Sequence, residues 1–191
     1  MSNTVKAASM LPGLPLPLAQ ALRRALNAKS PEGAHLGAYY FFEASLKLTG
    51  ASMVAVYLQD GAKEPKINKA LENLARPSTG HWLNLLREIA AWLGSRPDAG
   101  LLPLSGVGKR LTERSPKPAC VAFLKYAARA QEKDENRTNV SVLDLFDGIV
   151  GYRNAEVGHG GQRTQAFYRD AAPLLVDAMI EGFEAPTPSK A

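Results

Sequence analysis

The stretch Ala34–Gly61, AHLGAYYFFEASLKLTGASMVAVYLQDG, is the longest segment in which apolar residues recur at the spacing of an α-helix. Its wide apolar face comprises Tyr39, Phe42, Leu46, Met53 and Tyr57. Gly50 lies inside the run, where it either weakens the helix or marks a close contact with a neighbouring helix. The stretch therefore predicts one long helix that packs its apolar face into a core.

Shorter segments with helical signals lie on both sides of this stretch. They cover residues from about 17 to 30, then 66–76, 77–94, 119–133, 140–154 and 162–185. The prolines before residue 17 favour an extended start, and Pro173 predicts a kink or a break in the last helix. Residues 51–58 are rich in β-branched side chains, but they belong to the longer periodic run, so helix is the better prediction. We expect an all-α bundle of five or six helices.

The length of 191 residues suits one domain with its own core. We place this domain at residues 1–185 and treat 186–191 as a tail or linker. Residues 95–118 are rich in proline and glycine, which predicts a long connecting loop or insertion with room for a short helical turn.

Composition narrows the class of protein. No apolar run reaches the roughly 18 to 20 residues that span a bilayer, and the N-terminal segment lacks the pattern of a signal peptide. Cys120 is the only cysteine, which excludes an internal disulfide. These features favour the cytoplasm and no membrane association. The net charge of +5 is compatible with an anionic partner such as RNA.

The segment GYRNAEVGHGG, Gly151–Gly161, lies near the C-terminal end, at the break between two segments that each carry a strong helical signal. Arg153 follows Val142 and Phe146 at offsets that place it on the inward stripe of the preceding helix, at its C-terminal end. The glycines allow a turn that brings backbone close to a ligand, and His159 lies in that turn. A capping arginine with a histidine satisfied by backbone is the alternative interpretation.

These residue types suit a phosphodiester. Histidine moves protons near neutral pH, and arginine can hold a phosphate through two parallel hydrogen bonds and stabilise a pentacoordinate phosphorane. Asn154 could orient either partner. No cluster of carboxylates and histidines with metal-ligand spacing surrounds them, so we expect neither a metal nor a cofactor.

The segment resembles the signature of the HEPN superfamily (higher eukaryote and prokaryote nucleotide-binding domains), in which an arginine and a polar residue precede a histidine by a few positions. Arg153, Asn154 and His159 match these three positions. The resemblance implies a helical bundle with the motif near the junction of its last two main helices. It also implies a metal-independent endoribonuclease that acts as a homodimer. His159 would be the general acid or base, Arg153 the phosphate clamp and Asn154 the orienting group.

The chain departs from parts of this family pattern. One subgroup of toxins, which is controlled by a nucleotidyltransferase antitoxin, carries a tyrosine two residues after the histidine, where this chain has Gly161. The 95–118 segment is not part of a minimal bundle. Some members are inactive, so the alternative function is a silent interaction or dimerisation module at the N-terminus of a larger regulatory or defence protein.

Other polar residues carry weaker signals. The candidate RNA contacts are Arg163, Arg169, Lys109 and Arg110. Glu43 and Lys47 could line the same cleft, although an i, i+4 surface pair is the favoured interpretation. His81 suits a helix cap, and His35 has no evident partner. GVGKR, residues 106–110, lacks the glycine spacing, the following Ser or Thr and the strand of a phosphate loop.

Overall fold

The structure is a computed structural model that describes residues 3–61, 63–96, 104–129, 131–157 and 163–184. The described residues form nine α-helices and one pair of two-residue strands, so the predicted all-α class is confirmed. The α-helices are α1 (Asn3–Met10), α2 (Leu16–Leu26), α3 (Pro31–Asp60), α4 (Pro65–Glu72), α5 (Thr79–Ser95), α6 (Ser105–Thr112), α7 (Pro118–Arg129), α8 (Val142–Tyr152) and α9 (Gln165–Phe183). Short 3-10 turns follow α1 (η1, Leu11–Gly13) and α4 (η2, Asn73–Ala75).

The long helix predicted from residues 34–61 is α3, and local chemistry explains both of its ends. The Ser30 hydroxyl accepts a hydrogen bond from the Gly33 amide at 3.1 Å, and Pro31 occupies the first helical position. Gly61 ends the helix with a φ of 70°, a left-handed conformation that glycine adopts without strain. The predicted apolar face is confirmed: all of its members are fully buried except Tyr39, which is partly buried.

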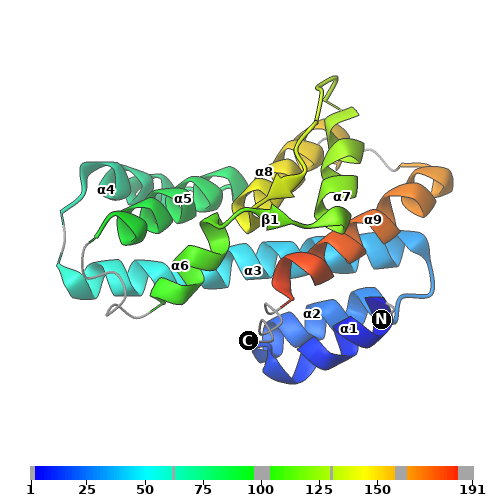
Figure 1. Cartoon of the computed structure of the whole chain (residues 1–191), viewed down its shortest axis with the longest axis horizontal. Helices are drawn as coiled ribbons and strands as arrows, with labels where there is room; N and C mark the ends of the chain where they lie inside the picture. Colours follow the sequence, from blue (N-terminus) through cyan, green and yellow to red (C-terminus); the bar gives the residue numbers. More distant parts are fainter. Residues whose placement is uncertain (1–2, 62, 97–103, 130, 158–162, 185–191) are drawn as a thin grey trace.

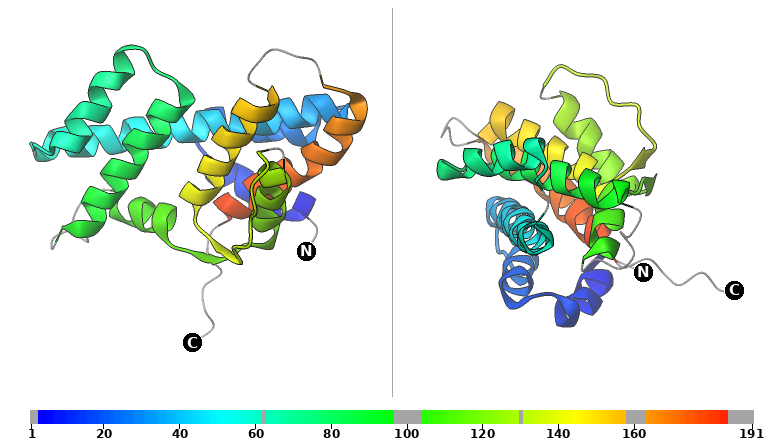
Figure 2. Two further views of the ribbon diagram at one scale, coloured as in Figure 1. Left: turned by 90° about the horizontal axis from the view of Figure 1, so that it is seen from above. Right: turned by 90° about the vertical axis from the view of Figure 1, so that its left-hand side faces the viewer.

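Helix α3 runs most of the length of the molecule (Figure 1), and α2, α5 and α9 pack directly along it. Helices α4, α5 and α6 cover one end of it, and α7, α8 and α9 lie at the other end. Helices α1 and α2 form a separate layer beside it (Figure 2). The core therefore lies between α3 and the helices that pack around it.

Two glycines of α3 mark its closest contacts. A Cβ atom at Gly37 would lie 2.7 Å from backbone atoms of Ala25, so α2 packs directly on the α3 backbone. A Cβ atom at Gly50 would lie 3.0 Å from the Trp82 ring of α5. Of the two explanations that the sequence left open for Gly50, the close helix contact holds.

The segment 95–118 contains more structure than a connecting loop. Its described part includes α6, whose Gly108 faces Leu93 of α5 and whose Leu111 is buried. Strand β1 (Ser115–Pro116) then pairs antiparallel with β2 (Asn139–Val140). The signal for this helix in the sequence is weak. The segment is rich in proline and glycine, and the apolar face of the helix is only two turns long.

The proline-rich stretch before residue 17 was expected to be extended, but Leu11–Gly13 form η1, and α1 precedes them. Ala7 of α1 is fully buried, and Lys6 forms an ion pair of 2.9 Å with Glu184, just after α9. Pro173 lies inside α9, which continues as one helix through it rather than breaking. Tertiary packing therefore outweighs the local helix-breaking signals at both ends of the chain.

Candidate functional site

The Arg153-Asn154 pair directly follows helix α8, and hydrogen bonds and ion pairs hold the start of this helix in place. Ser141 and Asp144 form a capping box, with the Asp144 amide 3.0 Å from the Ser141 hydroxyl and the Ser141 amide 2.8 Å from the Asp144 carboxylate. Arg114 and Arg137 also bind the Asp144 carboxylate, at 3.0 Å and 2.9 Å. These contacts anchor α8 to the segments before and after α7.

The buried stripe of α8 ends on Tyr152, and Arg153 lies beside it. The fully or nearly fully buried residues are Val142, Leu145, Phe146, Ile149 and Tyr152, whereas Arg153 is half-buried. The α-helix gives way at Arg153 to a π-helical turn, η4 (Arg153–Val157), which changes the angular step between residues. Tyr152, three residues after Ile149, takes the inward position that was expected of Arg153, and the half-buried Arg153 side chain lies at the edge of this stripe.

Arg153 and Asn154 present their polar groups together. The Arg153 guanidinium donates a hydrogen bond of 3.2 Å to the Asn154 side-chain oxygen, and Asn154 is exposed. Among the described residues, no carboxylate forms an ion pair with Arg153. Single-turn π segments inside helices are frequent at functional sites. Within the described part of the chain, these two side chains keep most of their hydrogen-bonding capacity for a ligand.

The third predicted residue, His159, lies outside the described residues, but the residues on both sides of its segment are described. Arg163 binds Glu156 twice: its Nε donates to the Glu156 carbonyl at 2.6 Å, and its Nη2 lies 3.1 Å from the carboxylate. The Arg163 guanidinium also lies 5.7 Å from the centre of the Phe167 ring. These contacts tie the π-helical turn to the start of α9.

A buried histidine lies beneath this turn. The His35 Nε2 atom, on the first turns of α3, is 2.8 Å from the Tyr152 hydroxyl, and both residues are at most 3 % exposed. The rings of Phe167 and Tyr168, at the start of α9, lie within 6.2 Å of the His35 ring centre. Phe123 of α7 contacts Tyr152 edge-on at 5.5 Å. Aromatic rings from α7 and α9 thus enclose one polar contact between α3 and α8.

Burial determines the protonation of this pair. Desolvation lowers the pKa of His35 from 6.5 to about 4. Burial also raises the pKa of Tyr152 far above its ordinary value, with smaller contributions from Tyr126 and Glu156. Both groups are therefore uncharged at neutral pH, and the hydrogen bond joins two neutral side chains. The pKa of Tyr126, at the rim, is raised by burial and by nearby Asp170 and Glu156.

The weaker candidates divide between the two ends of α9. Arg163 precedes the first turn of α9, whereas Arg110 donates hydrogen bonds to the carbonyls of Phe183, its last residue, and of Glu184, at 3.4 Å and 3.2 Å. The 19 residues of α9 span about 28 Å, so Arg110 and its neighbour Lys109 lie far from Arg153. Glu43 and Lys47 form an ordinary i, i+4 ion pair of 2.9 Å within α3.

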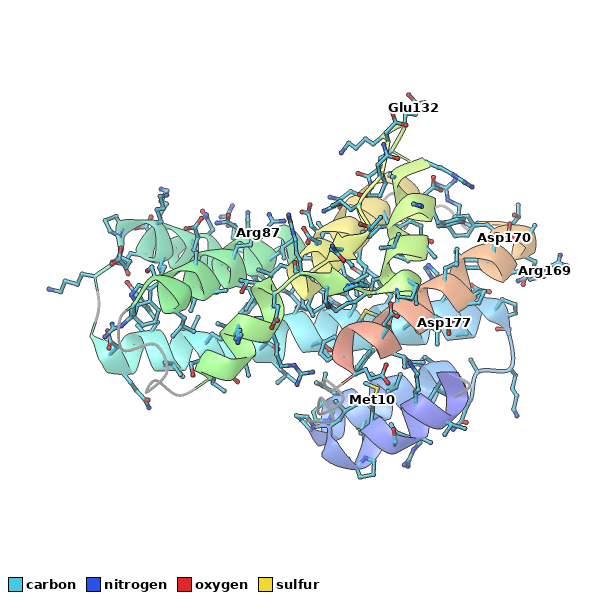
Figure 3. All side chains as sticks on the ribbon, viewed as in Figure 1. Met10, Arg87, Glu132, Arg169, Asp170 and Asp177 are labelled. Carbon is cyan, nitrogen blue, oxygen red and sulfur yellow. The ribbon has the colours of Figure 1, made fainter. Side chains whose placement is uncertain are left out.

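Arg169 lies on α9, with its side chain directed away from the core (Figure 3). It lines an open groove of about 450 Å³ together with Lys29 and Asp177, between α9 and the turn that joins α2 to α3. A second groove of about 660 Å³ lies at the other end of α9, against Leu14, Arg110 and Phe183. Neither groove includes Arg153, so the candidate site is a surface turn at the end of α8.

Within the part of the chain that the structure describes, no three His, Cys, Asp or Glu side chains converge as metal ligands would. No helix there combines the length and the hydrophobicity needed to cross a membrane.

Sequence reasoning missed the partnership between His35 and Tyr152. Two signals were present: His35 stands in an almost wholly apolar run, and Tyr152 follows Ile149 by three residues on the buried stripe. Neither signal could join residues that are 117 positions apart.

Comparison of this chain with protein-family models, with curated proteins and with solved structures yields no match.

Proposed function

We propose that the chain is a HEPN-like, metal-independent endoribonuclease domain. One observation carries the proposal: Arg153 and Asn154 leave the end of α8 on a π-helical turn, without a carboxylate partner among the described residues. An arginine in this state can accept a phosphate without first breaking an ion pair. The position between the last two helices of an all-α bundle also matches what the resemblance implies.

The proposed reaction is an internal transesterification of RNA. The ribose 2′-hydroxyl attacks the adjacent phosphorus, the bond to the 5′-oxygen breaks, and a 2′,3′-cyclic phosphate and a 5′-hydroxyl result. His159 transfers protons to or from these oxygens. Arg153 stabilises the charge on the phosphorane, and Asn154 orients the arginine or the phosphate through its amide.

A second copy of the chain is part of the proposal. Each chain carries one motif, and the resemblance implies that two motifs share one cleft in a homodimer. Such a ribonuclease would act in the cytoplasm, in defence or in a stress response. An antitoxin or a fused regulatory domain would restrain it.

The test is RNA cleavage with matched variants. Purified protein is incubated with mixed RNA in EDTA, and products are examined for 2′,3′-cyclic phosphate ends. We expect Arg153→Ala and His159→Ala each to lower the rate by a factor of about 100 or more. Arg23→Ala removes an exposed arginine of α2 and should leave the rate unchanged. Cleavage that survives both motif substitutions would reject this site.

A second candidate function, a silent interaction module, is favoured by a different observation. Helix α3 exposes large apolar side chains along its length, at 39 to 63 %: Leu36, Tyr40, Leu48 and Leu58. If the wild-type protein forms a dimer that Tyr40→Glu disrupts, and no RNA is cleaved, the interaction module is the better assignment.

A further inference from the structure

The contact between His35 and Tyr152 lies directly under the turn that carries Arg153. It joins the first turns of α3 to the last residue of α8, and the aromatic rings at the start of α9 close over it. Three elements that surround the candidate site therefore meet at one hydrogen bond. Every buried side-chain nitrogen and oxygen of the described residues has a hydrogen-bond partner, so this polar contact leaves no unsatisfied group.

We propose that His35 and Tyr152 are a positioning pair that sets the direction of the Arg153 side chain; this inference rests on the proposed ribonuclease function. Tyr152 is the residue before Arg153, so the Tyr152 ring fixes the backbone from which the guanidinium leaves. The Arg153 amide donates to the carbonyls of both Ile149 and Val150, a shared hydrogen bond of the kind that is common at helix ends. The π-helical turn then begins at Arg153, directly after the buried Tyr152.

The chemistry of the pair suits orientation better than stability. Apolar residues of similar size would fill the same space, and they often stabilise a core as much as or more than polar pairs do. The hydrogen bond of 2.8 Å between the His35 ring and the Tyr152 hydroxyl, however, fixes where the hydroxyl end of the Tyr152 ring lies, because a hydrogen bond depends on both distance and angle. The surrounding Phe167 and Phe123 rings exclude water that could replace either partner.

The test uses a matched pair of tyrosines. Tyr57, also fully buried, donates to the Asn68 side-chain oxygen at 2.8 Å and accepts from the Glu64 amide at 2.9 Å, at the other end of α3. Tyr152→Phe and Tyr57→Phe therefore each remove one buried phenol hydroxyl. We expect Tyr152→Phe to lower kcat on RNA about 10-fold to 100-fold with KM within twofold, whereas Tyr57→Phe leaves both unchanged.

The histidine supplies a rescue. His35→Leu should reproduce the loss in kcat, and His35→Gln, whose amide can still bond the Tyr152 hydroxyl, should recover most of it. Unfolding midpoints of all four variants show whether each is folded at the assay temperature. Equal losses of kcat in Tyr152→Phe and Tyr57→Phe would overturn the proposal, because the effect would then follow stability alone.

A measurement without RNA separates this inference from the proposed function. The ¹H–¹⁵N signal of the Arg153 Nε–H group, assigned by its absence in Arg153→Lys, should shift in Tyr152→Phe and remain in place in Tyr57→Phe. If the wild type cleaves no RNA but this signal shifts as expected, the ribonuclease proposal fails and the positioning pair stands. An unshifted signal in Tyr152→Phe would overturn the pair, whatever the activity.

Discussion

Acidification is a direct probe of the buried histidine. His35 is 3 % exposed, and burial lowers its pKa from 6.5 to about 4. The unfolded chain takes up a proton on this histidine near pH 6.5, and the folded chain does so only near pH 4. Protons therefore bind the unfolded state preferentially between these values. The stability that neutral His35 permits is fully present above pH 6.5 and is lost as the pH falls toward 4.

The magnitude follows from the same two pKa values. The linkage relation gives a loss of roughly 2 kcal/mol between pH 7 and pH 5, and of about 3 kcal/mol over the whole window. This is a large part of the 5 to 15 kcal/mol that is typical of a whole domain. Paired carboxylates titrate lower: the hydrogen bond from Arg137 lowers the pKa of Glu135 from 4.5, so its contribution is lost at more acidic pH.

Urea unfolding followed by tryptophan fluorescence at pH 7 and pH 5 measures this loss. The free energy of unfolding of the wild type should fall by about 2 kcal/mol more than that of His35→Gln, which cannot titrate. His81→Gln, in the half-buried cap of α5, should keep the wild-type dependence because His35 remains. An equal fall in the wild type and in His35→Gln would refute the reasoning.

Three further measurements test the packing. Gly37→Ala should destabilise the protein by about 1 to 3 kcal/mol, because the added Cβ would lie 2.7 Å from the α2 backbone. In the control Gly94→Ala the added Cβ meets no described atom within 4 Å, so the free energy of unfolding measured by denaturation should rise slightly or stay the same. Asp144→Asn should cost about 1 to 2 kcal/mol through the α8 cap, whereas Asp147→Asn, in the exposed pair with Arg87, should cost less than about 1 kcal/mol. Burial raises the pKa of the Cys120 thiol to about 12, so a thiol reagent should label it only on unfolding; immediate labelling of folded protein would contradict this burial.

The central part of the fold was predictable because its signals are local. The apolar repeat of α3, its Ser30-Pro31 start and its Gly61 end all lie within one segment. The caps of α5 and α8 are equally local: the Ser78 and Ser141 side chains each accept a hydrogen bond from the amide three residues further on. Only a short helical turn was expected where α6 lies, because Gly106 and Gly108 signal a loop and the burial of α6 depends on α5.

The candidate site was predictable only in part. The sequence predicted that Arg153 and Asn154 would lie at a helix end, but not that this end is a π-helical turn. It left His35 without a partner, since the Tyr152 hydroxyl comes from a distant helix. Helical periodicity assumes a constant angle per residue, and that assumption fails where the helix changes type.

The ion pair between Lys6 and Glu184 has a consequence for the order in which the chain is built. It joins residues 178 positions apart, and α1 packs on α9, a helix that is synthesised after it. Helices α2 and α3 can pack on each other early, because only the turn before Ser30 separates them. Helix α1 must wait for α9. It therefore gains its place in the fold only after the chain from α2 to α9 has been made.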